Sequence, residues 1–220
     1  MKKTAIILGA TGLTGSFLLN NLLVDERYDT IKLFSRRSIG RKHPKIKEYI
    51  IDVLNLQESK KDFIGDEVFC CIGTTEKKTK RKSIYRKIDI GIPAAAAKLA
   101  KENKINTFIV ISAMGANEKS KFFYNRVKGE MEKIILEEGI KYTYILRPSL
   151  IMGKRKENRF GEDLGNLFAK VLNPFLLGSL KNYRAISAKT IAKAMQVLAE
   201  SKPKEIKILL SSEIHTITTY

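Results

Sequence analysis

The sequence predicts an α/β fold in which helices cover both faces of a parallel sheet. Over its 220 residues, short unbroken apolar runs alternate with longer segments of helical periodicity. Unbroken apolar runs are typical of strands that are buried on both faces, and their alternation with helices indicates parallel pairing. With 44% hydrophobic and 29% charged residues, the composition is that of a globular protein. We therefore expect a single domain over residues 1–220.

The first half of the chain predicts four strands and two helices. Thr4–Leu8 is an apolar run, and Gly12–Val24 continues it with apolar residues at helical spacing. A basic segment, Arg36–Lys47, separates the next two apolar runs. The remaining elements of this half are strands at 30–34, 49–53 and 67–72 and, after a basic turn, a helix at 84–102.

The second half predicts three strands, two helices and one irregular segment. Strands are expected at 106–112, 141–146 and 205–210, and helices at 122–138 and 187–200. Gly139 follows the first of these helices, where glycine often ends a helix. Residues 151–184 contain Pro174 and four glycines and show no regular pattern. We interpret this segment as a small C-terminal cap on the substrate side of the domain.

The charge balance favours anionic partners. The chain has 41 Lys and Arg against 23 Asp and Glu, a formal net charge of +18. Such an excess suits phosphorylated cofactors, nucleic acid or acidic membranes. The basic clusters at 77–82 and 154–156 have no interleaved aromatic residues and match no recognition motif, so specific nucleic-acid binding is not expected.

The cysteines and the N-terminal segment bear on location. Cys70 and Cys71 are adjacent and belong to no metal-ligand pattern, so neither a disulfide framework nor a metal site is predicted. The apolar run Ala5–Leu8 is too short for a signal peptide or a transmembrane segment. We expect a cytoplasmic protein.

A glycine-rich turn follows the first predicted strand. Gly9, Gly12 and Gly15 have the spacing G-x-x-G-x-x-G and lead into a helix. Glycine permits a tight turn, lets the backbone approach a diphosphate and packs the helix closely on the strand. The helix N-terminus then presents free N–H groups to the anion. With Thr11, Leu13 and Thr14 between the glycines, this turn predicts a Rossmann-like, doubly wound dinucleotide-binding domain.

Basic residues after the second strand favour NADP(H). Arg36 and Arg37 stand where NAD-binding proteins usually carry an acid for the ribose 2′-hydroxyl. A guanidinium can instead bind a 2′-phosphate, and Arg36 is the first candidate. At the end of the third strand, Asp52 and Val53 are candidates for contact with the adenine, although Asp52 would also serve as a simple cap.

Tyr124 and Lys128 are candidate catalytic residues. They are four residues apart in a predicted helix and so lie on one face. A nearby ammonium lowers the pKa of a tyrosine, which can then exchange a proton with a carbonyl or alcohol oxygen. Lys128 could also hold the nicotinamide ribose. A second match to Y-x-x-x-K, Tyr28 to Lys32, lies away from any expected cofactor position.

Taken together, the glycine turn, the Y-x-x-x-K helix and Leu146-Arg147-Pro148-Ser149 resemble the short-chain dehydrogenase/reductase superfamily. The resemblance is to its atypical or extended branch, and within it to the Tat-interacting-protein-like NADPH-binding oxidoreductases. It implies that Gly73, Thr74 and Thr75 line the cofactor and that Arg147 and Pro148 meet the nicotinamide amide. Small residues at the end of a strand agree with this, because they let a flat ring approach.

The sequence differs from the family pattern at the serine that such enzymes carry after strand five. Ser112 matches the first position of the usual pair, and Ala113 occupies the second. Either Ser112 polarises the substrate oxygen, or the catalytic set is incomplete. Two functions therefore stay open: an NADP(H)-dependent oxidoreductase acting on an unnamed small molecule, and a non-catalytic NADPH-binding regulator or scaffold. We expect a monomer or a homodimer.

Overall fold

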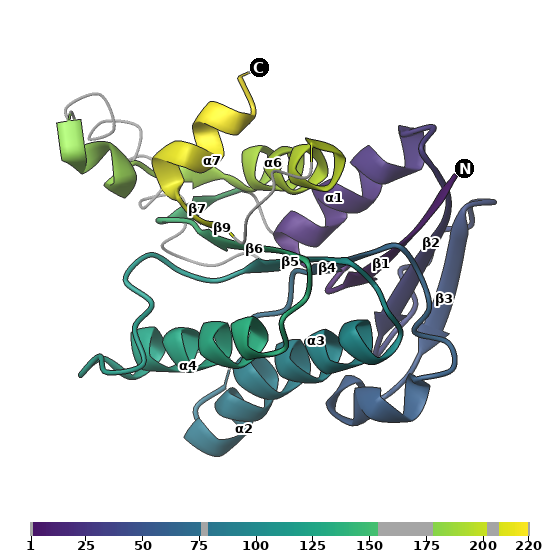
Figure 1. Ribbon diagram of the computed structural model, residues 1–220, viewed down its shortest axis with the longest axis horizontal. Coiled ribbons are helices and arrows are strands. Elements are labelled where there is room, and N and C mark those ends of the chain that lie inside the picture. Colours follow the sequence, from purple (N-terminus) through teal and green to yellow (C-terminus); the bar gives the residue numbers. More distant parts are fainter. Residues whose placement is uncertain (1, 76–78, 154–177, 202–206, 220) are drawn as a thin grey trace.

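The computed structural model describes residues 2–75, 79–153, 178–201 and 207–219. Within these ranges, a seven-stranded parallel sheet has the order β3-β2-β1-β4-β5-β6-β9 (Figure 1). The strands are β1 (Lys3–Leu8), β2 (Tyr28–Ser35), β3 (Ile46–Ile50), β4 (Glu67–Cys70), β5 (Thr107–Ile111), β6 (Tyr142–Arg147) and β9 (Lys207–Leu210). The order reverses beside β1, so the carboxyl ends of β1 and β4 border the crevice where such sheets bind ligands.

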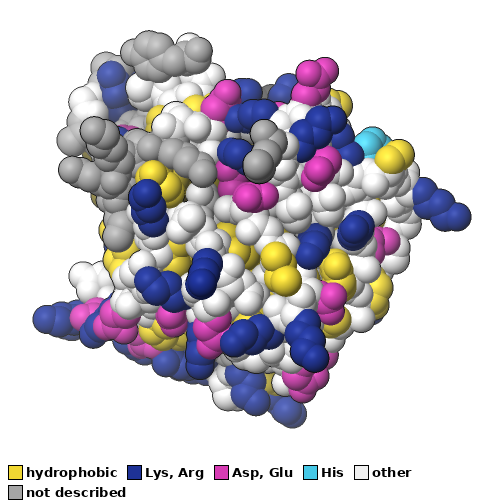
Figure 2. All heavy atoms as spheres, turned by 45° about the vertical axis from the view of Figure 1, so that its right-hand side comes forward, with side chains coloured by type: hydrophobic (Ala, Val, Ile, Leu, Met, Phe, Trp, Pro, Cys, Tyr) yellow, Lys and Arg dark blue, Asp and Glu magenta, His cyan; other side chains and the backbone are white. Residues whose placement is uncertain are grey.

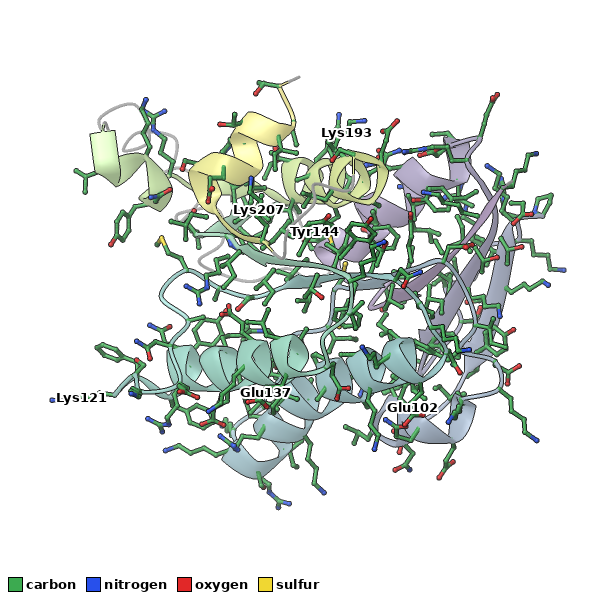
Figure 3. All side chains as sticks on the ribbon, in the orientation of Figure 1. Glu102, Lys121, Glu137, Tyr144, Lys193 and Lys207 are labelled. Atoms are coloured by element: carbon green, nitrogen blue, oxygen red, sulfur yellow. The ribbon has the colours of Figure 1, made fainter. Side chains whose placement is uncertain are left out.

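Helices cover both faces of the sheet (Figure 1). One layer contains α1 (Leu13–Val24), α6 (Ala188–Ser201) and α7 (Ser211–Ile217), and the other contains α2 (Lys82–Arg86), α3 (Ile92–Glu102) and α4 (Phe123–Glu137). Figure 3 shows Lys193 on the first layer and Glu102 and Glu137 on the second. The predicted Rossmann-like, doubly wound α/β fold is confirmed.

The two faces of β1 explain its unbroken apolar run. Ala5 and Ile7 pack in the core beneath α1 and α6, whereas Ile6 and Leu8 pack in the core beneath α3 and α4. All four side chains are completely buried. The strand therefore has no solvent face that would need polar residues.

Several shorter elements complete the described chain. They are the 3-10 helices η1 (Val53–Ser59) and η4 (Gly178–Tyr183), the π-helical segment η2 (Lys87–Gly91) and a two-stranded sheet of β7 (Ile151–Met152) and β8 (Ile186–Ser187). Among the described helices, none combines the length and the apolarity that crossing a bilayer requires. On the face shown in Figure 2, Lys and Arg side chains are scattered among acidic ones.

The structure corrects the predicted elements in three places. The third strand, predicted at 49–53, runs from Ile46 to Ile50, and Val53 begins η1. The helix predicted at 84–102 consists of α2, η2 and α3 in succession. The sequence analysis missed α7. Most of the predicted cap, residues 151–184, lies outside the described residues, which include only its two ends.

Candidate functional site

The glycine turn brings β1, α1 and the loop after β4 into close contact. Gly9 has φ +87°, and a Cβ there would lie 2.8 Å from the carbonyl oxygen of Cys71. A Cβ on Gly15 would lie 2.2 Å from the carbonyl oxygen of Gly9. The turn itself is closed by the Gly12 N–H, which donates to the Gly9 carbonyl at 2.9 Å. Side chains at Gly9 and Gly15 would therefore break the turn.

The turn fits the diphosphate of a dinucleotide. Gly12 is the N-cap of α1 and provides no side-chain cap, so the first amide groups of the helix are available to an anion. Thr11 is exposed at the turn, Leu13 is half-buried and Thr14 is buried beside it. In the loop after β4, the Thr75 hydroxyl oxygen is buried without a hydrogen-bond partner among the described residues. A buried polar group without a partner is a candidate for contact with a polar ligand.

The residues predicted to bind the adenosine end lie after β2 and β3. Arg36 and Arg37 are exposed, and neither forms an ion pair with another described residue. Asp52 caps η1, because its carboxylate accepts a hydrogen bond from the Leu54 N–H at 3.1 Å. The structure therefore gives Asp52 the capping role that the sequence left open, while Val53 is buried next to it.

Lys128 on α4 forms a buried ion pair that the sequence analysis missed. Its Nζ lies 2.9 Å from Oδ1 of Asp89, and the two side chains are 4% and 0% exposed. The other carboxylate oxygen of Asp89 accepts the Thr74 N–H at 2.8 Å. Asp89 therefore connects the Y-x-x-x-K helix to the loop after β4. The available signal was one acid inside the apolar segment Ile88–Ile92, most of which lies in the π-helical segment η2 (Lys87–Gly91).

The ion pair changes the expected electrostatics of Tyr124. Burial lowers the pKa of Lys128, but the attraction of Asp89 and Tyr124 outweighs burial and raises it. Burial raises the pKa of the Tyr124 hydroxyl; Lys128 lowers it and Asp89 raises it further. The net direction for Tyr124 is upward, so the predicted lowering does not occur. The main reason is the burial of the hydroxyl, and the carboxylate of Asp89 adds to it by opposing the effect of the ammonium.

Tyr124 faces a pocket at the carboxyl edge of the sheet. The pocket has a volume of about 440 Å³ and also contacts the loop after β4 through Thr74 and Thr75. Beside it, Gly73 is exposed, and a Cβ there would lie 3.7 Å from both Lys128 Nζ and Asp89 Oδ1. The structure thus brings the predicted residues of β4 and α4 together at one site.

Ser112 and Arg147 belong to a neighbouring cluster. The Ser112 hydroxyl is buried and donates to the carboxylate of Glu132. Arg147 Nε donates to the same carboxylate at 2.9 Å. Neither Ser112 nor Arg147 lines the pocket of Tyr124, whereas Arg147 and Glu132 line a more open hollow of about 600 Å³. Pro148 is buried, and its carbonyl accepts the Met114 N–H at 3.0 Å.

Comparison with known proteins identifies the family. A family described as NAD(P)H-binding matches residues 9–171, from the glycine turn onward. The chain belongs to this NAD(P)H-binding family. Family membership supports a nicotinamide cofactor and an oxidoreductase-type domain. Together with the relatives given next, it confirms the resemblance to the atypical branch of the short-chain dehydrogenase/reductase superfamily.

Individual relatives agree. The chain is 34% identical to "Protein FMP52, mitochondrial" of Candida albicans, over 80% of this chain and 78% of that protein. It is 32% identical to "Protein HTATIP2" of Rattus norvegicus, over 76% and 70%. Among solved structures, the NAD+ complex of WbmH from Bordetella bronchiseptica superposes with a TM-score of 0.72 at 14% identity, covering 97% of this chain and 77% of that one. At that identity, the superposition supports the fold alone.

The relatives correct one prediction. FMP52 proteins of Candida albicans and Candida glabrata are named as mitochondrial, so the predicted cytoplasmic location is wrong by this comparison. The prediction was drawn in part from two unpaired cysteines. Unpaired thiols show only that no disulfide framework is needed, and this property does not separate one reducing compartment from another.

Proposed function

We propose that the protein is an NADP(H)-dependent oxidoreductase that interconverts a carbonyl and an alcohol, with Tyr124 as the general acid and base. The observation that carries the proposal is the position of Tyr124 in the pocket beside Thr74 and Thr75, with Lys128 held one turn along the same helix by Asp89. A proton donor, a fixed cation and a cofactor-binding loop therefore meet at one edge of the sheet.

In this proposal the cofactor is held along the carboxyl edge. The turn from Gly9 to Gly15 would bind the diphosphate through amide groups of α1. Gly73 and Thr75 would line the nicotinamide half, and the buried Thr75 hydroxyl would gain the partner it lacks among the described residues. When bound, a reduced nicotinamide supplies a hydride, so that a carbonyl carbon gains two electrons while its oxygen gains a proton.

The side chains of Tyr124, Lys128 and Asp89 would then control the transfer of the proton to the carbonyl oxygen. Tyr124 has a raised pKa, so it is protonated at neutral pH and can donate to a carbonyl oxygen. Lys128 has a raised pKa and stays positively charged. Its charge stabilises the phenolate that Tyr124 becomes after donation. Asp89 acts through Lys128 and is a positioning residue.

Two exposed arginines support the preference for NADP(H) over NAD(H). Arg36 and Arg37 follow β2, at the place where the adenosine ribose lies in dinucleotide-binding domains. Neither is engaged in an ion pair with the described acidic residues, so a guanidinium is free to bind a 2′-phosphate.

The test is NADPH consumption with a panel of aldehydes, ketones and quinones. Wild-type protein should oxidise NADPH with at least one of them, and Tyr124→Phe should lose that turnover while it binds NADPH as the wild type does. The matched control is Tyr142→Phe, which removes a hydroxyl at the opposite, amino end of β6. Turnover that survives in Tyr124→Phe would refute the mechanism.

A second candidate function is a non-catalytic NADPH-binding protein. It is favoured by Ser112, whose hydroxyl donates to Glu132 and does not line the pocket of Tyr124. Without a second donor for the substrate oxygen, catalysis would be slow. Tight NADPH binding with no consumption across the whole panel would select this function.

A further inference from the structure

The pocket of Tyr124 is walled by rings and methyl groups. Its volume of about 440 Å³ lies within the range of small-molecule sites. The residues that line it are Thr74, Thr75, Tyr85, Phe122, Phe123 and Tyr124. Four of these six described side chains are aromatic, and none of the six is charged, so this part of the pocket is suited to a flat and largely apolar molecule.

Two of the rings form a fixed wall. Tyr85 and Phe123 meet edge to face, with ring centroids 5.4 Å apart and planes at 65°. Tyr85 is completely buried, and its hydroxyl donates to the Thr74 carbonyl at 3.3 Å. The wall is therefore locked to the same loop that the cofactor is proposed to contact.

A third ring is free to meet a ligand. Phe122 precedes α4 and is 75% exposed, the highest exposure of any described aromatic side chain. A phenylalanine so open to water costs solvation free energy that a stacked ligand would recover. Lys121, next to it, projects away from the molecule at the end of α4 in Figure 3, so the charged neighbour leaves the ring uncovered.

Among the described residues, the charge nearest the rings of the pocket is positive and therefore disfavours a cationic ligand. Lys82 Nζ lies 5.3 Å from the centroid of the Phe123 ring. Inside, the ammonium of Lys128 is paired with Asp89. Among the described lining residues, the polar group that remains for a substrate is the Tyr124 hydroxyl, since the Thr75 hydroxyl is proposed to meet the cofactor.

We propose that this pocket binds a flat aromatic carbonyl compound, with its ring against Phe122 and Phe123 and its oxygen at the Tyr124 hydroxyl. The inference rests on the proposed function and names its substrate class. In the reduction, the carbonyl carbon takes the hydride of the reduced dinucleotide, and the oxygen takes the Tyr124 proton. The products are an aromatic alcohol and the oxidised dinucleotide, and Tyr124 regains its proton from water.

Binding can be measured apart from turnover. The probes are 2-naphthol and decahydro-2-naphthol, which share a carbon skeleton and a hydroxyl but differ in flatness. Calorimetric titration of the full chain with NADP+ present should show 2-naphthol binding about tenfold more tightly, since ring stacking adds to simple burial. The matching substrates are benzaldehyde and cyclohexanecarbaldehyde, and benzaldehyde should have the higher kcat/KM.

Variants at Phe122 test the ring itself. Phe122→Leu keeps an apolar side chain and removes the ring, and it should weaken 2-naphthol binding about threefold to tenfold. Phe122→Trp keeps a ring and should retain the selectivity. The control is Ile64→Ala, which truncates a side chain that is 56% exposed and lies just before β4, at the amino end of the sheet. It should leave both affinities unchanged.

The outcomes separate this inference from the proposed function. Equal affinities for the two naphthol probes, or unchanged selectivity in Phe122→Leu, would overturn the aromatic pocket even if carbonyl compounds are reduced. Selective binding of 2-naphthol that depends on the Phe122 ring would support the pocket. If no carbonyl compound is reduced in that case, the proposed reaction fails and the binding site stands.

Discussion

The chain contains the pattern Y-x-x-x-K twice, and the two copies have opposite surroundings. Tyr28 and Lys32 lie on β2. Tyr28 is 1% exposed, and its hydroxyl donates to the buried carboxylate of Glu67, whereas Lys32 donates to the Asp62 carbonyl at 2.9 Å. At the carboxyl edge of the sheet, by contrast, Tyr124 faces a pocket and Lys128 is buried in an ion pair with Asp89.

Backbone geometry accounts for the difference. Four residues advance about 13 Å along a strand and about 6 Å along a helix. Only the helical copy, Tyr124 and Lys128, therefore brings phenol and ammonium close together. The strand copy starts at the amino end of β2, where the Tyr28 hydroxyl donates to the carboxylate of Glu67. Burial is the main cause that raises the pKa of Tyr28, and the charge of Glu67 raises it further. The motif thus has chemical meaning only with its secondary structure and its place in the sheet.

Exchanging each tyrosine for phenylalanine should give the sharpest contrast. Tyr124→Phe removes the proton donor and should lower kcat for carbonyl reduction by about 10²–10⁴-fold with little change in stability. Tyr28→Phe leaves Glu67 short of a donor and should lower the free energy of unfolding by about 1–3 kcal/mol with kcat unchanged. NADPH oxidation and urea denaturation measure the two effects. The same response to both changes would refute the distinction.

Removing the carboxylate of Asp89 should have the next largest effect. Asp89→Ala leaves the ammonium of Lys128 buried without its partner and should lower the free energy of unfolding by about 3–5 kcal/mol. The control is Glu102→Ala, which breaks an exposed ion pair with Lys60 and should change stability far less. Equal losses of unfolding free energy in the two variants would show that the buried ion pair is no more important for stability than the exposed one.

Asp89→Asn separates charge from packing. It keeps an oxygen that can accept the Thr74 N–H and removes the negative charge that raises the pKa of Tyr124. The pKa of Tyr124 should then fall. Because carbonyl reduction needs the protonated tyrosine, activity is lost as pH rises through that pKa, and the variant should lose activity at lower pH than the wild type. If the alkaline limb of the pH profile of kcat/KM did not shift, the charge of Asp89 would have no effect on the pKa of Tyr124.

Arg36→Ala should change cofactor choice. Loss of the guanidinium should weaken NADPH binding by about 10- to 100-fold and leave NADH binding almost unchanged. Arg41→Ala removes the same charge from the same segment, where Arg41 donates to Asn20 at 2.7 Å, and should have little effect. Fluorescence titration with the two cofactors measures both. Equal affinity of the wild type for NADPH and NADH would refute the predicted preference.

Ser112→Ala should have only a small effect on turnover. The hydroxyl donates to Glu132, so its loss should lower the free energy of unfolding by about 1–3 kcal/mol and leave kcat within about tenfold of the wild type. A fall in kcat of about 10²–10³-fold at unchanged stability would instead assign Ser112 to the substrate oxygen.

The parts of the site that depend on local sequence were predictable. The glycine turn is one such part, because Gly9 has a positive φ and Gly15 is required by its close contact with the Gly9 carbonyl. The helix of Tyr124 and Lys128 is another, because a period of four residues fixes its face. For the same reason, the apolar run of β1 predicted its burial on both sides.

Features that depend on distant contacts were not predictable. Asp89 meets Lys128 only after η2 packs against α4, and nothing in its neighbourhood marks a partner 39 residues away. The third strand was placed too late because Ile51 and Val53 extend its apolar run, although the chain turns there into η1 under the cap of Asp52. The direction of the Tyr124 pKa shift was misjudged because it depends first on burial in the folded chain and then on Asp89, and both arise only from distant contacts.

The π-helical segment Lys87–Gly91 makes the alignment of the site sensitive to insertions and deletions. Each residue turns an α-helix by about 100°. Deleting one residue from this wider turn would allow regular α-helical winding through to α3, but it would rotate Asp89 relative to the face that packs on α4. The lysine would then lose its counter-charge although every residue of the Y-x-x-x-K helix was unchanged. Length, as much as identity, is therefore under constraint in this stretch.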